Sequence, residues 1–319
     1  MRILVTPTSF LKPQNIQAKE MLEDFADEVV YNDLGIPLAG DELLKRLRGV
    51  DGYIAGVDYI TGDVVNCMPP KLKVISRYGA GVDRVDIEAC KKKGITVANT
   101  PGANSVAVCE LAFGLMLSTA RNIPRLHQAV TNGEWPRNEG VELSGKTLGI
   151  VGMGAIGKNL AIRALAFNMK VIAYDPFFDK RFACQNNITE MALDDVLRQA
   201  NFISLHVPLN KSTRHMINAE SISKMQEGTI IINTARGGII DEEAAARAIK
   251  DGKLAGLGLD AFEQEPLKDS PLKGLDHVVF TPHTGAHTSE AVKNMGLMAV
   301  KNVISILKGE DCPYIVNGR

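Results

Sequence analysis

Three glycines with a spacing that suits a bound pyrophosphate follow a short apolar segment, 147–151, in this 319-residue chain. In the pattern G-x-G-x-x-G, Gly152 allows a tight turn and Gly154 allows a pyrophosphate to approach the backbone. Gly157 allows the next helix to pack closely on the preceding strand. The pattern therefore predicts a strand, a glycine loop and a helix over about 155–168.

An acidic residue ends the second apolar strand of the same unit, 170–174. Asp175 lies 18 residues after Gly157 (175 − 157 = 18), near the separation at which a carboxylate accepts hydrogen bonds from the adenosine ribose. Because a carboxylate at this point repels a 2′-phosphate, the sequence predicts NAD rather than NADP. The alternative is an ordinary strand-to-helix turn with a surface aspartate, but the complete order of strand, glycines, helix, strand and acid favours the cofactor site.

Other candidate residues follow predicted strands, because ligands of open α/β sheets bind beyond the carboxyl ends of the strands. Among them are a fixed cation, Arg236, a titratable imidazole, His283, and a glycine-containing segment at 77–81. Hydride transfer between a nicotinamide and a ketone needs a proton donor near the carbonyl oxygen. It also needs a positively charged side chain that binds the substrate anion. His283 and Arg236 can supply these two groups.

The elements that must position these residues alternate along the chain. In the first 98 residues we expect strands at 2–6, 28–31, 52–55, 72–76 and 95–98, with helices near 15–25, 41–48, 63–68 and 86–93. Alternation of this kind predicts βαβ units and a parallel sheet. The first hundred residues should therefore form an α/β domain of their own, without a glycine fingerprint.

A second α/β sheet is predicted around the glycine loop. Its further strands are expected at 202–206, 229–233, 254–260 and 278–281, with helices near 193–198, 222–225, 241–250 and 289–307. Before it, the turn-rich segment 99–104 leads into 106–120, which is apolar nearly all round, with Glu110 as its single charge. A helix of this composition must be covered on every face, so we expect it between two domains or in a subunit interface.

Composition narrows the possible partners and compartment. The formal net charge is −1 and no basic block stands out, so nothing indicates binding to nucleic acid or to an anionic membrane. The five cysteines are scattered and form no C-x-x-C pair, which favours reduced thiols over disulfides or a metal site. The N-terminal residues MRILVTPTSF lack the long apolar core of a signal peptide. We therefore expect a cytoplasmic protein without a bound metal.

Six segments together resemble the D-isomer-specific 2-hydroxyacid dehydrogenase family. They are RYGAGVDRVD (77–86), GMGAIGK (152–158), LHVPLNKST (205–213), INTARGGIID (232–241), GLDAFEQEP (258–266) and TPHTGA (281–286). Within the family the chain is similar to short-form phosphoglycerate dehydrogenases and their relatives. The resemblance implies an α/β protein in which a Rossmann NAD-binding domain, 99–286, is inserted in a smaller flavodoxin-like substrate-binding domain, 1–98 plus 287–319. It also implies a homodimer.

The resemblance implies the roles of three candidate catalytic residues. His283 matches the family's acid/base, Glu265 its partner carboxylate, and Arg236 the cation that binds the substrate's carboxylate and carbonyl oxygen. A carboxylate bonded to His283 favours the imidazolium, which can then donate to the developing alkoxide. A planar guanidinium also matches a 2-keto acid better than an ammonium does. The alternatives are His287 as the acid, and Glu265 as a solvated loop residue.

The resemblance also implies cofactor and substrate contacts. Ala155 and Ile156 match positions at the pyrophosphate, and Val207, Pro208 and Thr213 match positions along the adenosine. The positions around the nicotinamide are Thr234, Ala235, Asp260 and Gly285. On the substrate side, Arg77 matches a basic position, and the backbone N–H groups of Tyr78, Gly79, Ala80 and Gly81 should bind the carboxylate as an anion nest.

The substrate pair that we expect first is phosphoglycerate and phosphohydroxypyruvate. Arg77 and Arg137 match basic positions that serve the phosphate in that group, but Gly56 and Val57 stand where it usually has an Arg-Ser pair, and Arg84 replaces the usual Asn of G-x-D-N. Alternatives are hydroxypyruvate, glyoxylate, or another sugar acid or sulfo acid. A rival from another class is an NAD-sensing binding protein similar to the C-terminal-binding-protein corepressors.

Overall fold

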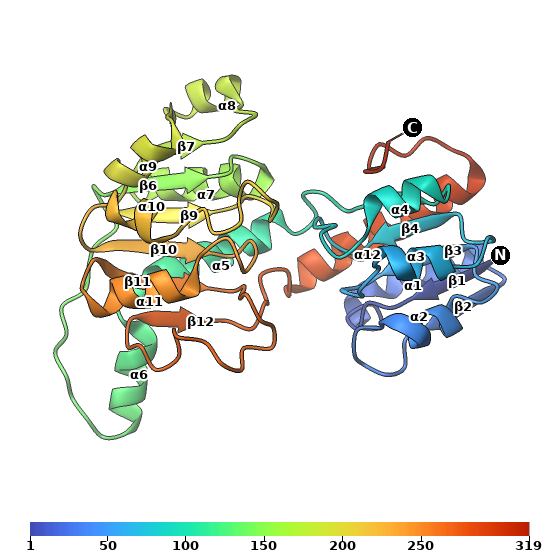
Figure 1. The fold of residues 1–319 in the computed structure, drawn as a ribbon, viewed down its shortest axis with the longest axis horizontal. Helices are drawn as coiled ribbons and strands as arrows, with labels where there is room; N and C mark the ends of the chain where they lie inside the picture. The colour runs from blue at the N-terminus through green and yellow to red at the C-terminus, as the bar shows by residue number, and fades with distance from the viewer. Residues whose placement is uncertain (319) are drawn as a thin grey trace. The chain divides into compact units, whose positions relative to one another are not determined.

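A computed structural model describes residues 1–318 and divides them into two compact units. The first comprises residues 1–104 together with the C-terminal segment from Ala286, and the second comprises Ser105–Gly285 (Figure 1). The chain therefore leaves the first unit once and returns to it once. Each unit is an α/β structure with its own parallel sheet.

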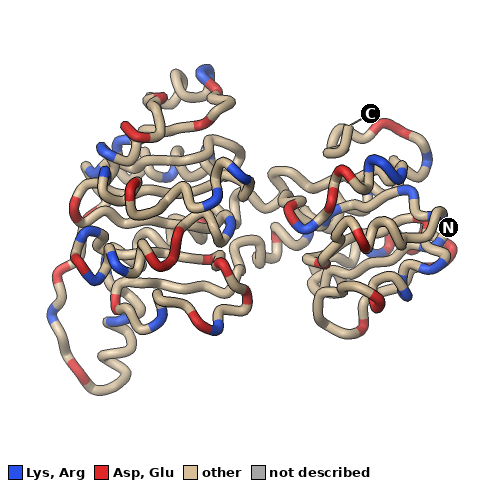
Figure 2. Tube along the Cα trace, in the orientation of Figure 1, with Lys and Arg blue, Asp and Glu red and all other residues tan. Residues whose placement is uncertain are grey.

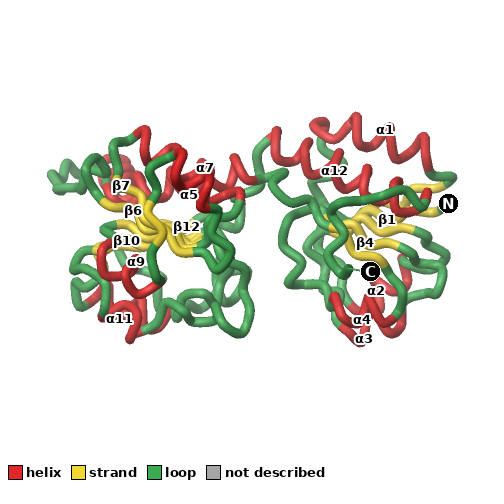
Figure 3. Tube along the Cα trace, turned by 90° about the horizontal axis from the view of Figure 1, so that it is seen from above, coloured by secondary structure: helices red, strands yellow, loops and turns green. Residues whose placement is uncertain are grey.

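The first unit contains a five-stranded sheet in the order β2-β1-β3-β4-β5, and every neighbouring pair is parallel. Helices α1 and α12 cover one face, and α2, α3 and α4 cover the other (Figure 3). This strand order is that of flavodoxin-like folds, as the resemblance implied. The elements are β1 (Arg2–Val5), η1 (Pro13–Asn15), α1 (Ile16–Phe25), β2 (Glu28–Tyr31), α2 (Gly40–Arg46), β3 (Gly52–Ala55), α3 (Gly62–Cys67), β4 (Val74–Arg77), α4 (Ile87–Lys92), β5 (Thr96–Ala98) and α12 (Ser289–Lys308).

The second unit contains a seven-stranded sheet in the order β12-β11-β10-β9-β6-β7-β8. Helices α5 and α7 lie on one face, and α9 and α11 on the other (Figure 3). The order of the strands reverses between β6 and β9, so this is a doubly wound Rossmann-like sheet with its switch point there. The elements are α5 (Ser105–Ala120), α6 (Ile123–Thr131), β6 (Thr147–Val151), α7 (Ala155–Ala166), β7 (Lys170–Tyr174), α8 (Lys180–Gln185), β8 (Thr189–Glu190), α9 (Leu193–Gln199), β9 (Phe202–Leu205), α10 (Ala219–Ser223), β10 (Thr229–Asn233), α11 (Glu242–Lys250), β11 (Leu254–Leu259) and β12 (Val278–Phe280).

Side chains at the helix starts explain why several helices begin where they do. Asp86, Asp179, Asp241 and Thr288 each accept a hydrogen bond from a backbone N–H of the first turn of α4, α8, α11 and α12. Such caps satisfy N–H groups that have no partner inside the helix. The central strands β3, β4, β9 and β10 are buried along their whole length, and apolar residues predominate in them, with Ser76, Arg77 and Ser204 among the exceptions.

The crossing segment 99–104 belongs to the first unit, not to the NAD-binding domain in which the sequence placed it. Its first residue explains the difference, because Asn99 N donates to Tyr314 O at 3.1 Å and Asn302 Nδ2 donates to Asn99 O at 2.8 Å. Thr100 N also donates to Gly79 O. Ala286, likewise expected in the NAD-binding domain, lies with the first unit.

Helix α5 packs inside the second unit, against β10, β11, β12 and α7. The sheet and α7 therefore cover much of the apolar surface that we expected to lie between domains or in a subunit interface. The sequence missed α6, α8 and the two-residue strand β8. Among residues 1–318 no single helix is long and apolar enough to cross a membrane; α5 and α6 meet that test only as a pair, bent by 61°.

Charged residues of both signs are interspersed over each unit (Figure 2). This pattern agrees with the near-neutral formal charge of −1.

Candidate active site

The glycine loop lies at the switch point of the second sheet. Gly152 has φ +102°, and a Cβ there would lie 2.7 Å from the carbonyl carbon of His206 at the end of β9. A Cβ on Gly157 would lie 2.2 Å from the Gly152 oxygen. Both positions therefore exclude any side chain, as the G-x-G-x-x-G pattern predicts.

The second glycine of the loop is different, because a Cβ on Gly154 would meet no atom within 4 Å. Gly154 is the N-cap of α7, and Ala155 and Ile156 are its first two helical residues. The open space thus lies beside backbone N–H groups at a helix N-terminus, where a pyrophosphate binds favourably. The loop fits the cofactor that the sequence predicts.

Two buried polar atoms near the carboxyl ends of β9 and β10 are also suited to a ligand. His206 Nδ1 and Thr234 Oγ1 have no hydrogen-bond partner among residues 1–318. Buried polar atoms normally have partners, so each such atom needs an explanation. A dinucleotide bound along this edge supplies one, since nicotinamide and ribose both carry hydrogen-bonding groups.

Asp175 follows β7 and contacts the glycine loop directly. Its Oδ2 accepts from Met153 N at 2.7 Å and its Oδ1 accepts from Phe177 N at 2.7 Å. Each carboxylate oxygen has a second lone pair, so Asp175 can still accept hydrogen bonds from a ribose. The residue therefore also orders the loop, a function that its sequence position did not reveal.

His283 and Glu265 form a hydrogen-bonded pair. His283 Nδ1 lies 2.8 Å from Glu265 Oε1, and the same oxygen accepts from Phe262 N at 3.2 Å. The His283 side chain is 43% exposed, and its Nε2 makes no hydrogen bond with residues 1–318. Glu265 therefore orients the ring so that Nε2 is the nitrogen that can exchange a proton with a ligand.

The Asp260 carboxylate holds the segment that carries His283. Asp260 is 1% exposed, and its Oδ1 accepts from Thr281 Oγ1 at 2.6 Å and from Thr284 N at 2.8 Å. Its Oδ2 accepts from Gly285 N at 2.8 Å. The resemblance assigned Asp260 and Gly285 to the nicotinamide. In the structure the two residues are hydrogen-bonded to each other, and this contact helps to shape the 281–285 loop.

Arg236 lies in a turn that Asn233 stabilises. Asn233, the last residue of β10, donates from Nδ2 to Arg236 O at 2.7 Å and accepts at Oδ1 from Ala235 N at 3.0 Å. A Cβ on Gly237 would lie 1.8 Å from Phe262 O, so this turn presses against the segment that leads to Glu265. The sequence analysis missed Asn233, although a buried polar residue at the end of an apolar strand is a recognisable signal.

The residues expected along the adenosine form a tight turn after β9. Val207 is buried and Pro208 is exposed. Thr213 Oγ1 donates to Pro208 O at 2.6 Å and accepts from Asn210 N at 2.9 Å. Thr213 therefore closes this turn rather than presenting a free hydroxyl.

A second histidine–carboxylate pair lies in the same unit. His215 Nε2 is 2.9 Å from Glu263 Oε1, and His215 N donates to Gly238 O at 2.7 Å. The pair therefore links the turn after β9 to the segments that carry Arg236 and Glu265. The sequence analysis did not single out either residue.

The expected substrate residues of the first unit, Arg77 to Gly81, lie together at the end of β4. Arg77 is 6% exposed and donates to backbone carbonyls, including Ala55 O at 2.9 Å and Gly81 O at 3.1 Å. Tyr78 N donates to Ala55 O and Gly79 N donates to Thr100 Oγ1. Of the four N–H groups of the expected nest, those of Ala80 and Gly81 have no acceptor among residues 1–318.

Arg84 and Gly56, two departures from the phosphoglycerate dehydrogenase pattern, contact neighbouring backbone. Arg84 donates to Val57 O at 2.8 Å, and its guanidinium carbon lies 4.6 Å from the centre of the Tyr59 ring. A Cβ on Gly56 would lie 3.1 Å from Pro7 Cα, so a long side chain at this position requires the backbone to shift. In residues 1–318 no group of three His, Cys, Asp or Glu side chains could hold a metal ion.

Comparisons with known proteins agree on one family. Residues 113–285 match the family model described as "D-isomer specific 2-hydroxyacid dehydrogenase, NAD binding domain". A D-3-phosphoglycerate dehydrogenase of Methanocaldococcus jannaschii is 42% identical over 99% of the chain, which spans 59% of that relative. A hydroxypyruvate reductase of Thermotoga maritima is 46% identical over 85% of the chain and 89% of the relative.

A solved structure gives the same result. The D-lactate dehydrogenase of Aquifex aeolicus, complexed with NAD and lactic acid, superposes with a TM-score of 0.85 and 31% identity, covering 99% of both chains. That protein binds NAD and a 2-hydroxy acid on the same fold. The glycine loop and the parallel second sheet of the present chain are thus those of an NAD-binding family.

The open space at Gly154 generates a first prediction. With φ −68° the position accepts alanine without backbone strain, so Gly154→Ala should leave the midpoint of urea unfolding unchanged. The added methyl should meet the pyrophosphate and weaken NADH binding about tenfold, equivalent to about 1.4 kcal/mol. Fluorescence titration with NADH measures this. Gly114→Ala, at another open position in α5, is the matched control; unchanged affinity in both variants would contradict the cofactor site.

His206 generates a second prediction. Burial lowers the pKa of His206 to about 4 from its usual 6.5. Between these values the unfolded chain binds the proton and the folded chain does not, so stability is lost as the pH falls from about 6.5 to 4. This histidine should account for about 3 kcal/mol of that loss.

His206→Gln should therefore flatten the dependence of the free energy of unfolding on pH between 4 and 6.5. Urea denaturation at several pH values measures the slope. His127→Gln, at an exposed histidine, provides the control. If the free energy of unfolding depends on pH with the same slope in wild type and in His206→Gln, burial does not lower the pKa of this imidazole.

Proposed function

The chain belongs to the D-isomer-specific 2-hydroxyacid dehydrogenase family, a family of NAD-dependent oxidoreductases, and from this premise we propose that it interconverts a small D-2-hydroxy acid and its 2-keto acid. The observation that carries the proposal is the 2.8 Å contact between His283 Nδ1 and Glu265 Oε1, which leaves His283 Nε2 for a ligand. A positioned imidazole of this kind is the usual general acid and base.

Bound NAD supplies the hydride chemistry, and the protein supplies the proton and the charges. In the direction of reduction, His283 Nε2 donates a proton to the carbonyl oxygen as negative charge develops there. Glu265 stabilises the charged ring before donation, and Arg236 attracts the substrate anion with a planar guanidinium. In oxidation, neutral His283 accepts the hydroxyl proton at the same nitrogen.

We propose further that the preferred substrate carries no phosphate. The expectation of phosphoglycerate rested on Arg77 and Arg137, and the Arg77 guanidinium contacts carbonyl oxygens inside the first unit. Gly56, at the position of the usual Arg-Ser pair, cannot take a long side chain without a backbone shift. The 46% identity to a hydroxypyruvate reductase supports a substrate with no charged group besides its carboxylate, as in hydroxypyruvate or glyoxylate.

His283→Gln tests the proton donor. The variant should keep its affinity for NADH and lose about two or more orders of magnitude in kcat, as expected for the removal of a general acid. Single-turnover oxidation of NADH measures the rate. His287→Gln, at an exposed histidine four residues later, should retain wild-type turnover; the opposite ranking of the two variants would move the proton donor to His287.

A comparison of keto acids tests the substrate. Wild-type kcat/KM should be at least about tenfold higher with hydroxypyruvate or glyoxylate than with phosphohydroxypyruvate, the factor expected from about 1.4 kcal/mol of unmatched binding. The assay is the loss of NADH absorbance, with NADPH as the control for cofactor choice. A clear preference for phosphohydroxypyruvate would restore the phosphate-binding roles of Arg77 and Arg137.

We also propose that the protein is a homodimer and that α6 with residues 131–142 contributes to the contact. Every residue of 131–142 is exposed, and Trp135 is 79% exposed. The segment projects from the β12 side of its unit (Figure 1). Ile123 and Val130 add further exposed apolar surface on α6. Exposed aromatic and aliphatic side chains clustered in this way favour burial against a second copy.

Trp135→Ser should shift the protein from dimer to monomer, because a buried tryptophan commonly contributes more than about 2 kcal/mol to an interface. Sedimentation equilibrium measures the mass. Phe177→Ser, at a still more exposed aromatic outside this segment, should leave the mass unchanged. A dimer of unaltered affinity in Trp135→Ser would place the interface elsewhere.

A cytoplasmic location completes the proposal. Its support is that all five cysteines are free, with Cys90, Cys109 and Cys312 buried. Such thiols persist in a reducing compartment. Fractionation of cells that express the chain tests the location, and recovery of the protein outside the cytoplasm would contradict it.

A further inference from the structure

Two histidine–carboxylate pairs of the second unit meet on one short loop, 261–266. His283 Nδ1 contacts Glu265, and His215 Nε2 lies 2.9 Å from Glu263 Oε1. Both histidines have a left-handed backbone conformation, with φ +52° at His283 and φ +48° at His215. A residue with a Cβ adopts that conformation at a cost, and it persists only where the surroundings impose it. The proposed reaction uses only the first pair, although the second is built in the same way.

The backbone of His215 is bonded on both sides, so its side chain starts from a fixed point. His215 N donates to Gly238 O at 2.7 Å, and His215 O accepts from Asn218 Nδ2 at 2.9 Å. The turn before it, 207–213, carries the positions expected along the adenosine and is closed by the Thr213 hydroxyl. The imidazole of His215 therefore extends from the end of the adenosine turn.

Glu263 is fixed at the other end of the contact. Its N–H donates to Glu242 Oε1 at 2.9 Å, and Glu242 lies in the first turn of α11. Immediately before it, Phe262 is 7% exposed and donates from N to Glu265 Oε1 at 3.2 Å. The side chain of Glu263 therefore extends from the loop that places the Glu265 carboxylate.

The hydrogen bond between these two side chains does not depend on the charge of the imidazole. An ionised carboxylate only accepts, so His215 Nε2 carries the hydrogen in the neutral ring and in the charged ring. The side chains of His215 and Glu263 are 35% and 36% exposed, and a contact this open to water adds little to the stability of the fold. Its effect is local, because it joins the adenosine turn to the loop 261–266.

We propose that His215 and Glu263 are positioning residues, which join the adenosine turn to the loop of the Glu265–His283 pair. One framework then holds both the surface for the cofactor and the orientation of the proton donor. The inference rests on the proposed function, since it takes NAD to bind along this turn and His283 to donate the proton. It gives the second pair an effect on cofactor affinity and on turnover.

His215→Gly carries the main test. Glycine adopts the left-handed conformation without strain, so the change removes the imidazole and leaves the backbone in place. The Kd of NADH and that of ADP-ribose, which lacks the nicotinamide, should each rise about fivefold in calorimetric titrations without a keto acid. The value of kcat for glyoxylate reduction should fall about fivefold, because the loop that orients His283 loses its link to the turn.

Glu263→Ala should cause the same two changes. The double variant His215→Gly with Glu263→Ala should be no worse than either single variant, because residues that act through one contact are non-additive. Glu263→Gln keeps an oxygen that accepts from His215, so it should retain most of the wild-type affinity and turnover. Additive losses in the double variant would show that the two residues act separately.

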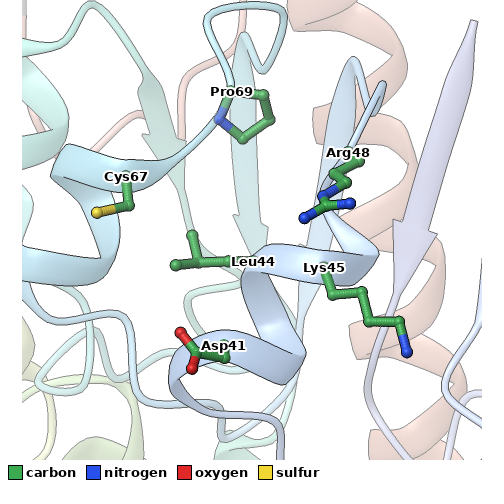
Figure 4. Close-up of a pocket in the computed structure, with 6 residues that line it drawn as sticks. All are labelled: Asp41, Leu44, Lys45, Arg48, Cys67 and Pro69. Atoms are coloured by element: carbon green, nitrogen blue, oxygen red, sulfur yellow. The ribbon is translucent and has the colours of Figure 1, made fainter.

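Two matched controls separate the contact from its side effects. Asn187→Gly makes the same kind of change at another left-handed residue of the second unit, with φ +54° and an exposed side chain. Asp41→Ala tests whether the loss of one exposed carboxylate is by itself enough to affect an anionic cofactor. Asp41 belongs to the first unit, where it lines a small surface cavity of about 370 Å³ with Leu44, Lys45, Arg48, Cys67 and Pro69 (Figure 4). Both control variants should keep the wild-type Kd and kcat.

Either of two further results would overturn the inference. Unchanged Kd values and an unchanged kcat in His215→Gly would make the pair a surface contact only. A change in Kd alone, or in kcat alone, would show that the pair supports one segment and does not join two. Wild-type protein that binds NADH but reduces no keto acid would contradict the proposed function and the effect on turnover, and the Kd values would still report on the adenosine turn.

Discussion

The buried carboxylate of Asp260 organises the candidate active site. A carboxylate that is 1% exposed is costly unless hydrogen bonds replace the lost water. Thr281, Thr284 and Gly285 supply them, so the 281–285 loop must adopt the shape that presents these donors. In that shape His283 has φ +52°, a conformation uncommon outside glycine, and its ring meets Glu265.

The backbone of the same residue links the segment of the proton donor to that of the cation. Asp260 N donates to Asn233 O at 2.9 Å, and Asn233 in turn fixes the turn that carries Arg236. Residues that follow or end three strands are therefore joined to one another by short hydrogen bonds. The proposed reaction needs a proton donor and a cation at fixed positions relative to each other, and such a network holds their segments in place.

Much of this arrangement could be predicted because it depends on local pattern. The glycine spacing, the apolar runs of β6, β7 and β10, and the residues after each strand are visible in the sequence, and parallel strands bring their carboxyl ends to one edge. The family, the two α/β sheets and NAD as the cofactor are confirmed. The roles of His283, Glu265 and Arg236 remain predictions, now supported by geometry.

What the sequence could not show are contacts between residues far apart in the chain. Asn99 meets Ala80, and Asn302 meets Asn99, through hydrogen bonds that no local pattern encodes. Arg77 resembled a ligand for phosphate because its residue type was visible and its carbonyl partners were not. The sequence did not predict helix α6, because few of its side chains are buried. In addition, its N-cap Asn122 has a left-handed conformation and is followed by Ile123 and a proline.

The most direct test of the central claim is a transfer experiment with hydroxypyruvate and NADH that carries deuterium at both C4 positions of the nicotinamide. If the chain reduces a 2-keto acid as proposed, mass spectrometry should find the deuterium at C2 of the product, and chiral chromatography should show the D isomer. A product without deuterium, or one of the L configuration, would contradict the account.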